Sequence, residues 1–492
     1  MNYAIIFRLL GIILTALCVA MAVSLGIAFF FDGDVGREGT AIRGFTMSIV
    51  ISSSLAVAFQ LMSREGEMKM LRKEAITVIG LGWILASLVG ALPYYLILPD
   101  CSVADAVFES TSGITTTGAS VFSTLEGFPR SLLFWRAISQ WIGGLGIVVF
   151  FVSLLSFLGV GAKILFSGES SASSTELDSP RVRIGILHIM YLYFGLSAIC
   201  AVAYRFCGLN WFDAVCHMFT TVSTAGFSTK TASIGAFDNA TFEWTVIFFM
   251  LLGGMSFLVM VRVLQGDFRV LLRNSEVKSL LLIVIIATLL VAETLLDQNS
   301  MEGFHTLIRK SVFQTVSILT TTGYSSANFD VWSETTHAVL LVLMLIGGCS
   351  GSTAGGLKIV RVIAAFRICL LQIEKAFRAR LFRQIKISGR TIDTETKVSI
   401  SGYIVLAMSL CFAGMLVVAY LEPGFSMKGM FSAAIACFFN IGPGFSEVGP
   451  AQNYGELKGL TKSFLSLLMI MGRVELFPVL VLFVPTLWRR FY

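Results

Sequence analysis

The run Thr320-Thr321-Thr322-Gly323-Tyr324 closes a short apolar segment that lies between two much longer ones. Three related runs close short segments elsewhere in the chain at roughly even spacing: Thr115-Thr116-Thr117-Gly118-Ala119, Ser223-Thr224-Ala225-Gly226-Phe227 and Phe439-Asn440-Ile441-Gly442-Pro443. Self-similarity at a regular period is typical of chains built from tandem structural units. The sequence therefore predicts four repeats, each carrying one glycine-containing run.

The composition around these runs is that of a membrane protein. Of the 492 residues, 56% are hydrophobic and 13% are charged. A helix of about 20 apolar residues crosses the roughly 30 Å hydrocarbon core of a bilayer. Ten segments are predicted to span the membrane: 4–30, 41–62, 75–98, 132–158, 184–206, 243–263, 278–297, 336–371, 397–420 and 461–487.

Within each of the last four pairs of spans lies a segment that is too short to cross the bilayer. These segments cover residues 103–116, 210–224, 305–321 and 427–440, and they suit re-entrant helices. Non-helical backbone at membrane depth persists only where protein or water covers it. We therefore expect the four re-entrant segments to converge on one central axis.

The predicted fold is an all-α polytopic membrane protein with four tandem span–pore-helix–span repeats around one pore, preceded by two extra spans. The predicted units are the N-terminal spans at 1–70 and the pore repeats at 71–165, 180–270, 275–375 and 395–492, with an intramembrane loop at 347–357 in the third repeat. The copies resemble one another only weakly outside the runs, so an asymmetric pore is expected.

Lysine and arginine concentrate in the loops 63–74, 262–278 and 358–397, and Arg489 and Arg490 close the chain. Because cytoplasmic loops carry an excess of these residues, the pattern places both termini in the cytoplasm. The re-entrant segments then open outward. The same loops account for the net charge of +6, so nucleic-acid binding is not indicated, and the basic stretch within the last loop suits anionic lipid headgroups.

The glycine-containing runs have the chemistry of a cation selectivity filter. A ring of backbone carbonyls can replace the hydration shell of a potassium ion, and glycine accepts the dihedral angles needed to aim carbonyls inward. The short helices would also point their partly negative C-terminal ends at the ion. The predicted ion-binding residues are Thr116, Thr117, Gly118, Thr224, Ala225, Gly226, Thr321, Thr322, Gly323, Asn440, Ile441 and Gly442. The fourth run lacks threonine, and its geometry is expected to differ.

The segment 336–371 is too long for one straight helix and is interrupted by a stretch rich in glycine and serine, which is a poor helix interior. A kink with tight helix packing, a phosphate loop and a flexible loop across the pore are three possible interpretations. The phosphate loop lacks its Gly-Lys-Ser/Thr ending. A flexible loop across the pore would include Gly347, Gly348, Ser350, Gly351, Ser352, Thr353, Gly355 and Gly356.

Arg473 lies within the last predicted span, where a charged side chain is costly and should face the bundle interior with a partner. Glu475 is a poor partner because residues i and i+2 do not share a helix face. Two interpretations are open: a salt bridge to a distant residue, or a positive charge that faces the pore near the glycine-rich loop.

The remaining polar residues indicate no catalytic chemistry. Asp105, Glu109 and Asp213 lie in re-entrant segments, where an acid near the start of a short helix complements the helix dipole; tuning of the pore field is the alternative. The four histidines and nine cysteines show no metal-ligand spacing. The sequence predicts no bound cofactor, no catalytic residue and no enzymatic activity.

The four runs, together with Asp105–Glu109, Gln140–Gly146 and the glycine-rich break, resemble the Trk/Ktr/HKT superfamily of cation uptake proteins. The two leading spans resemble its bacterial TrkH branch, and the resemblance covers nearly the whole chain. It implies potassium transport across the bacterial inner membrane, a homodimer, and control by a cytosolic ring of nucleotide-binding TrkA-type subunits. It also implies that the glycine-rich loop is a gate whose carbonyls Arg473 holds while it acts as a barrier to cations.

Within that superfamily, glycine in all four runs accompanies potassium preference, whereas serine in the first run accompanies sodium preference. This chain has glycine in every run, so potassium is the expected transported ion and a sodium-selective pore is the alternative. A proton- or sodium-coupled transporter with broken helices around a midplane site is a further alternative. That architecture would favour inverted repeats and intramembrane acids, whereas the repeats here are parallel and the span centres hold few acids.

Overall fold

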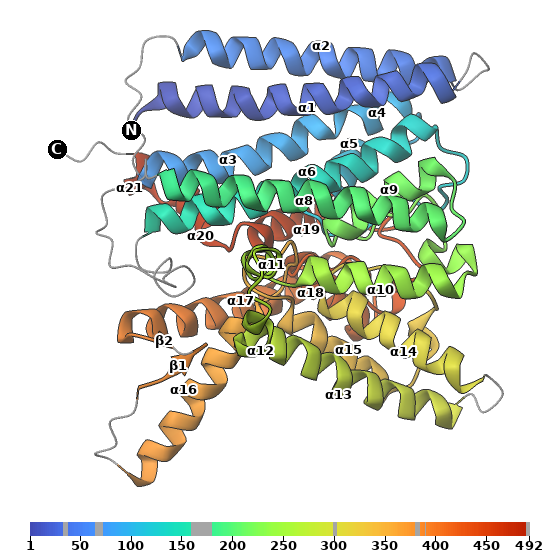
Figure 1. Ribbon diagram of the computed structural model, residues 1–492. Helices are drawn as coiled ribbons and strands as arrows, with labels where there is room; N and C mark the ends of the chain where they lie inside the picture. Colours follow the sequence, from blue (N-terminus) through green and yellow to red (C-terminus); the bar gives the residue numbers. More distant parts are fainter. Residues whose placement is uncertain are drawn as a thin grey trace.

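The computed structural model describes residues 1–32, 38–63, 72–158, 180–298, 303–378, 384–388 and 390–488. Helices make up almost all of the regular structure in these ranges (Figure 1). The basic residues expected in the loop 64–71, together with Arg489 and Arg490, lie outside the described residues.

The two extra N-terminal spans form a pair of long helices along one side of the molecule (Figure 1). They are α1 (Tyr3–Phe31) and α2 (Glu38–Met62), and α1 also packs against helices of the first repeat. Asn2 caps α1, because its side-chain oxygen accepts a hydrogen bond from the N–H of Ile5. The pair thus flanks the four-repeat unit, as the sequence predicted.

Four units follow, and each contains a long incoming helix, a short helix and an outgoing helix in that order. The first holds α3 (Arg72–Gly90), α4 (Leu92–Ile97), α5 (Val103–Ile114) and α6 (Arg130–Leu158), and the second holds α8 (Pro180–Phe206), α9 (Trp211–Val222), α10 (Ala240–Gly254) and α11 (Phe257–Leu264). The third holds α12 (Arg269–Arg273), α13 (Ser275–Gln298), α14 (Phe304–Leu319), α15 (Glu334–Ile346) and α16 (Ile359–Phe377). The fourth holds α17 (Thr394–Leu421), α18 (Met427–Phe438), α19 (Gly459–Arg473), α20 (Phe477–Leu480) and α21 (Pro485–Trp488). Short 3₁₀ turns lie between helices within the last three units: η1 (Ser233–Phe237), η2 (Phe329–Val331), η3 (Ser446–Val448) and η4 (Val481–Phe483).

The short helices α5, α9, α14 and α18 hold the units together. Each packs against the incoming and outgoing long helices of its own unit. Each also packs against the outgoing helix of the unit before it: α9 against α6, α14 against α10, α18 against α15 and α5 against α19. The last of these contacts joins the first unit to the fourth, so the packing closes into a ring.

The predicted span 336–371 divides into α15 and α16, as its glycine-rich break indicated, and two further predicted spans are also not continuous helices. The segment 243–263 divides into α10 and α11, which are bent by 102° relative to each other. The segment 461–487 stops being helical after Arg473, where Glu475 and Leu476 take up left-handed φ angles of 60° and 68°. Among the described residues, six helices are long and apolar enough to cross a membrane, or seven if the bent pair counts as one span.

The bend between α10 and α11 is stabilised by another unit. The carbonyl oxygens of Gly253 and Gly254 accept hydrogen bonds from the backbone N–H groups of Thr353 and Cys349. Glycine already weakens a helix by about 1 kcal/mol relative to alanine, and these distant donors satisfy the carbonyl groups that the break releases. The break therefore depends on contacts that a local pattern cannot reveal.

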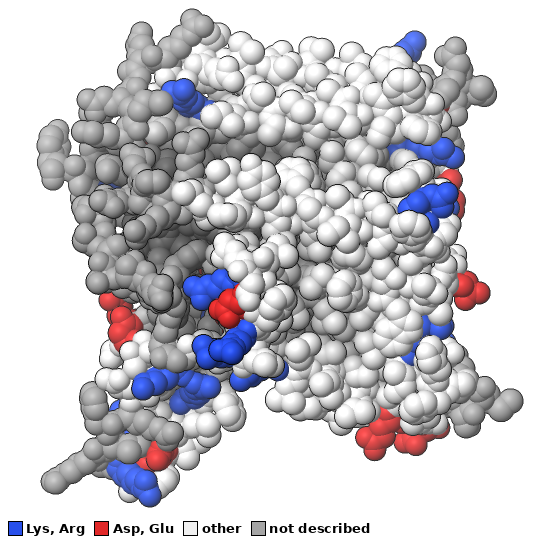
Figure 2. Space-filling view, in the orientation of Figure 1, with Lys and Arg blue, Asp and Glu red and all other residues white. Residues whose placement is uncertain are grey.

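Charged side chains gather toward the two ends of the long helices and leave a broad, mainly uncharged band between them (Figure 2). The start of α1 and the helix α21 lie at the same end (Figure 1). Beyond α16, β1 (Lys386–Ile387) and β2 (Arg390–Thr391) pair in antiparallel fashion. This small ladder was not predicted, because strands of two residues are too short to show alternation.

Candidate functional site

Capping residues fix where three of the four short helices begin. Ser102 and Asp105 form a reciprocal capping box at the start of α5, which confirms the capping role predicted for Asp105. Asn210 caps α9, and Ser426 caps α18. Asp213 accepts a hydrogen bond from the side chain of Asn210 at 2.8 Å. The capping role predicted for Glu109 is wrong, because Glu109 lies in the second turn of α5 and its carboxylate accepts hydrogen bonds from Arg136 and Val121.

All four short helices end in the same way. The backbone N–H of the third residue of each run donates to the carbonyl five residues earlier, at 2.8 to 2.9 Å. This is the long hydrogen bond of a Schellman motif. The donor and acceptor pairs are Thr117 and Ser112, Ala225 and Thr220, Thr322 and Ser317, and Ile441 and Ala436.

The backbone conformation of the runs also repeats four times. The second residue of each run has a φ angle between 50° and 55°, in the left-handed region: Thr116, Thr224, Thr321 and Asn440. A side chain in this region costs roughly 1–2 kcal/mol. The glycine two positions later has φ between 78° and 102°: Gly118, Gly226, Gly323 and Gly442. Four copies of the same strained turn indicate a shared functional geometry.

The four runs touch one another in a closed circle. A Cβ atom placed on each glycine would collide with a carbonyl oxygen of the next run. The distances are 2.3 Å from Gly118 to Ala225, 1.9 Å from Gly226 to Thr322, 1.9 Å from Gly323 to Ile441 and 2.7 Å from Gly442 to Thr117. The twelve residues predicted to bind the ion are therefore brought together at one place, and only hydrogen fits on the glycine Cα atoms.

Side chains behind the runs hold their backbone in place. The amide of Gln140 donates to the carbonyl of Ala225 at 2.8 Å and accepts from the N–H of Phe227 at 3.1 Å. In the fourth run, Asn440 donates from Nδ2 to the hydroxyl of Thr117 at 3.0 Å and so links that run to the first. The hydroxyl of Thr117 also bonds with that of Thr115 at 2.7 Å. These hydroxyl groups brace the backbone in this structure.

A buried ion pair spans the first two runs. Arg136 binds Oε1 of Glu109 through Nη2 at 2.7 Å and through Nε at 2.9 Å, and the two side chains are 2% and 0% exposed. The other oxygen of Glu109 accepts from the N–H of Val121, just after the first run. Arg136 donates to the carbonyl of Ser228, just after the second run, at 3.1 Å. Glu109 is thus a structural partner of Arg136, which sequence reasoning missed because the partners lie on different helices.

The glycine-rich loop between α15 and α16 packs directly against three of the runs. The N–H of Gly355 donates to the hydroxyl of Thr321 at 2.6 Å, and the hydroxyl of Thr224 donates to that of Thr353 at 3.1 Å. The N–H of Gly356 donates to the carbonyl of Phe439 at 3.1 Å. All eight predicted loop residues lie in the connection from Gly347 to Gly356, which contains no helix.

Arg473 reaches this loop from the end of α19. Its Nη1 donates to the carbonyl of Thr353 at 2.7 Å, and Nη2 approaches the carbonyl of Gly143 at 3.4 Å. The side chain is 3% exposed, and Nε has no partner among the described residues. A salt bridge from Arg473 to a distant acid is therefore absent from the described part of the chain. Glu475 instead pairs with Arg361 at 2.7 Å.

A small cavity of about 120 Å³ lies on the far side of the ring from the loop, and all four run glycines line it. Its wall also includes Arg136, Lys230 and Tyr454. The hydroxyl of Tyr454 donates to the carbonyl of Gly442 at 2.9 Å. The ring thus lies between this open mouth and the glycine-rich loop.

Comparison with known proteins assigns the architecture. A family model described as "TrkH: Cation transport protein" matches residues 41–490. The chain belongs to this family. The family consists of transport proteins, so the prediction that the chain is not an enzyme is confirmed.

Relatives within the TrkH family match over their full length. The chain is 32% identical to the Trk system potassium uptake protein TrkH of Halomonas elongata and 30% identical to that of Escherichia coli K12, with all of both chains covered in each case. The crystal structure of the potassium transporter TrkH from Vibrio parahaemolyticus superposes with a TM-score of 0.90 at 28% identity, covering 99% of this chain and 100% of that one. The predicted fold class is thereby confirmed.

We expect alanine at Gly226 or Gly323 to lower cation uptake about tenfold, the effect of roughly 1.4 kcal/mol of distortion. Gly442→Ala should lower uptake less, because its Cβ atom would lie 2.7 Å from the carbonyl oxygen of the next run, compared with 1.9 Å at Gly226 and Gly323. Gly195→Ala on α8 is the control, since a Cβ atom added there would meet no atom from outside its own stretch of helix within 4 Å. Rubidium uptake by vesicles holding each purified variant measures the effect. Equal uptake by Gly195→Ala and Gly226→Ala would contradict the ring.

Removing one partner of the Glu109–Arg136 pair should destabilise the protein by about 3–5 kcal/mol, because a buried charge is left alone. The double variant Glu109→Gln with Arg136→Met should lose less stability than the sum of the single variants. Arg378→Gln, in an exposed pair with Glu374 at 3.7 Å, should hardly change the melting temperature. Thermal unfolding in detergent measures all four variants, and strictly additive losses would show that the two groups are not coupled.

Proposed function

We propose that this chain takes up potassium ions across the bacterial inner membrane through a pseudo-fourfold selectivity filter. The four runs would supply the backbone carbonyls, and no bound cofactor takes part. The observation that carries the proposal is the closed circle of four runs with one repeated backbone conformation. A ring of carbonyl oxygens from such runs can replace the hydration shell of a potassium ion.

Two observations favour potassium over sodium. Each run has glycine at the position where a Cβ atom would collide with the next run, so no side chain at these four positions displaces a backbone carbonyl group of the ring. The relatives that cover the whole chain are named as potassium uptake proteins. A sodium-selective pore and a proton- or sodium-coupled transporter are the alternatives that the uptake experiment must separate.

The gate would consist of the loop 347–357 and Arg473. The loop is tied to the second, third and fourth runs and to the carbonyls of Gly253 and Gly254, which supports a position across the inner end of the ring. Arg473 adds a buried positive charge that binds a loop carbonyl and, within the described ranges, no carboxylate. An uncompensated cation at this point raises the energy of any second cation beside it.

Location and partners follow from the same assignment. Both termini would lie in the cytoplasm, since the start of α1 and the basic helix α16 lie at the same end of the molecule (Figure 1). The Trk-system names of the relatives support association with other components of such a system. The partners that we propose are a second copy of this chain, which would form a homodimer, and a cytosolic, nucleotide-binding TrkA-type ring at that end. Basic side chains there would also meet anionic lipid headgroups.

Rubidium uptake into vesicles that hold the purified full-length chain tests the transported ion. Saturable uptake that potassium inhibits and sodium does not is the expected result. Equal inhibition by sodium would favour a sodium-permeable pore. Uptake that requires an imposed proton or sodium gradient would favour a coupled transporter, and no uptake in any lipid would contradict transport by this chain alone.

Arg473→Ala should raise basal rubidium flux, because it removes both the positive charge and the bond that holds the carbonyl of Thr353. Ser463→Ala, on the exposed side of the same helix, serves as the control and should leave the flux unchanged. Flux through Arg473→Ala that equals or falls below that of the wild type would argue against a gate at this position. Melting temperatures of both variants show whether the protein is intact.

A further inference from the structure

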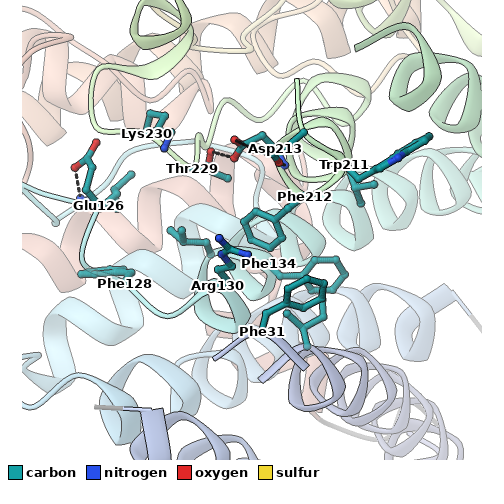
Figure 3. Close-up of a pocket in the computed structure, with 15 residues that line it drawn as sticks. Phe31, Glu126, Phe128, Arg130, Phe134, Trp211, Phe212, Asp213, Thr229 and Lys230 are labelled. Atoms are coloured by element: carbon teal, nitrogen blue, oxygen red, sulfur yellow. Dashed lines mark hydrogen bonds between the residues drawn. The ribbon is translucent and has the colours of Figure 1, made fainter. Parts of the chain in front are cut away.

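A cavity of about 700 Å³ lies among α1, α6 and α9 (Figure 3). The end of α1 that lines it is at the end of the molecule opposite the start of the chain (Figure 1). Most of its lining is apolar or aromatic, including Phe134 and Phe212. Phe31 and Trp211 on its rim are 56% and 58% exposed. Its volume lies in the range of small-molecule sites, roughly 300–1,000 Å³. Exposed aromatic rings at the end of a spanning helix are typical of the membrane interface.

Arg130 enters this cavity from the start of α6. Its guanidinium carbon lies 5.8 Å from the ring centre of Phe31 and 5.9 Å from that of Phe212. Figure 3 shows the guanidinium group among these rings. Within the described ranges, its side-chain nitrogens have no hydrogen-bond or ion-pair partner. An exposed arginine in an apolar, aromatic setting is well suited to bind a phosphate group in two-point fashion.

The carboxylates near the cavity are already engaged by neutral donors. Figure 3 shows the carboxylate of Glu126 turned away from Arg130. Hydrogen bonds from Thr231 hold the pKa of Glu126 at about 2. The donors are the backbone N–H groups of Arg130 and Ser131 for Asp32, the side chains of Asn210 and Thr229 for Asp213, and the N–H and hydroxyl of Thr231 for Glu126.

We propose that this cavity binds an anionic phospholipid of the outer leaflet, with its phosphate on Arg130 and its first acyl segments against Phe31, Phe134 and Phe212. The apolar lining and the exposed aromatic rim provide for the acyl chain, and the free guanidinium selects the negative headgroup. The assignment to the outer leaflet rests on the orientation proposed above, whereas the binding itself does not.

Lys230 connects this lipid site to the ion pathway. It lines both the 700 Å³ cavity and the mouth above the four glycines. Its positive charge opposes cation entry, and a lipid phosphate beside it offsets that charge. Because a unit charge at about 10 Å in water changes local ion concentration about twofold, anionic lipid should lower the KM for rubidium about twofold.

Fluorescence quenching tests the binding. The full-length protein is placed in nanodiscs with brominated phosphatidylglycerol or brominated phosphatidylcholine, and the Trp211 signal is taken as the difference between the wild type and Trp211→Phe. Quenching should be stronger by phosphatidylglycerol, and Arg130→Gln should remove this preference. Arg205→Gln is the control, since Arg205 lies beside Trp211, 6.0 Å from its ring, but outside the cavity. Equal quenching by both lipids, or an equal loss of preference in Arg205→Gln, overturns the site.

Uptake kinetics test the link to the pore. Vesicles of phosphatidylcholine should show about twice the rubidium KM of vesicles with phosphatidylglycerol, and Lys230→Gln should give the lower KM in both. If quenching is selective but the wild-type KM is the same in both lipids, the link between the lipid site and the ion pathway is contradicted, whereas the lipid site itself is not. Absence of uptake in every lipid would contradict the proposed function, while the quenching result would still decide the lipid site.

Discussion

The close approach of each run to the next is the constraint on which the rest of this structure depends. At Gly226 and Gly323 an added carbon would lie 1.9 Å from a neighbouring carbonyl oxygen, which leaves no room for any side chain. Left-handed residues in all four runs add strain of roughly 1–2 kcal/mol each. That strain persists because the Schellman bonds, Gln140 and the Glu109–Arg136 pair hold the runs from behind. No repeat can form its run alone, since each run rests on its neighbour.

The loop and Arg473 extend this constraint beyond the runs, because both contact residues packed against the ring. A buried guanidinium is costly unless it is paired and hydrogen-bonded. Here one carbonyl at 2.7 Å and one at 3.4 Å satisfy it only in part, and Nε has no partner among the described residues. Glu475 lies two residues away, yet it pairs with Arg361 on α16. The chain therefore keeps the positive charge of Arg473 uncompensated beside the loop, where a neutral side chain would be cheaper to bury.

Local sequence signals were sufficient for the features that depend on neighbouring residues. Hydropathy and the glycine runs predicted the two leading helices, the four short helices and their convergence. The position of an acid near the start of a short helix predicted a capping role for Asp105, and the structure adds its partner Ser102. The bend at Gly253 and Gly254 escaped prediction because the donors that stabilise it are about 100 residues away. The role of Glu109 escaped for the same reason, since its partner Arg136 lies on another helix. The assignment of the run and loop residues to ion binding and gating remains a proposal.

The fourth run shows how the ring departs from fourfold symmetry. Asn440 has the same φ angle as the threonines at its position, and asparagine tolerates the left-handed region more readily. Its amide reaches the hydroxyl of Thr117 and the carbonyl of Met469, so one side chain joins the last repeat to the first. Gly442 has the largest φ angle of the four glycines, 102°, and the widest gap to the next run. The ring is therefore closed by a side-chain contact at the junction where backbone packing is loosest. In the proposed filter, a cation would meet the most loosely packed carbonyls at this junction.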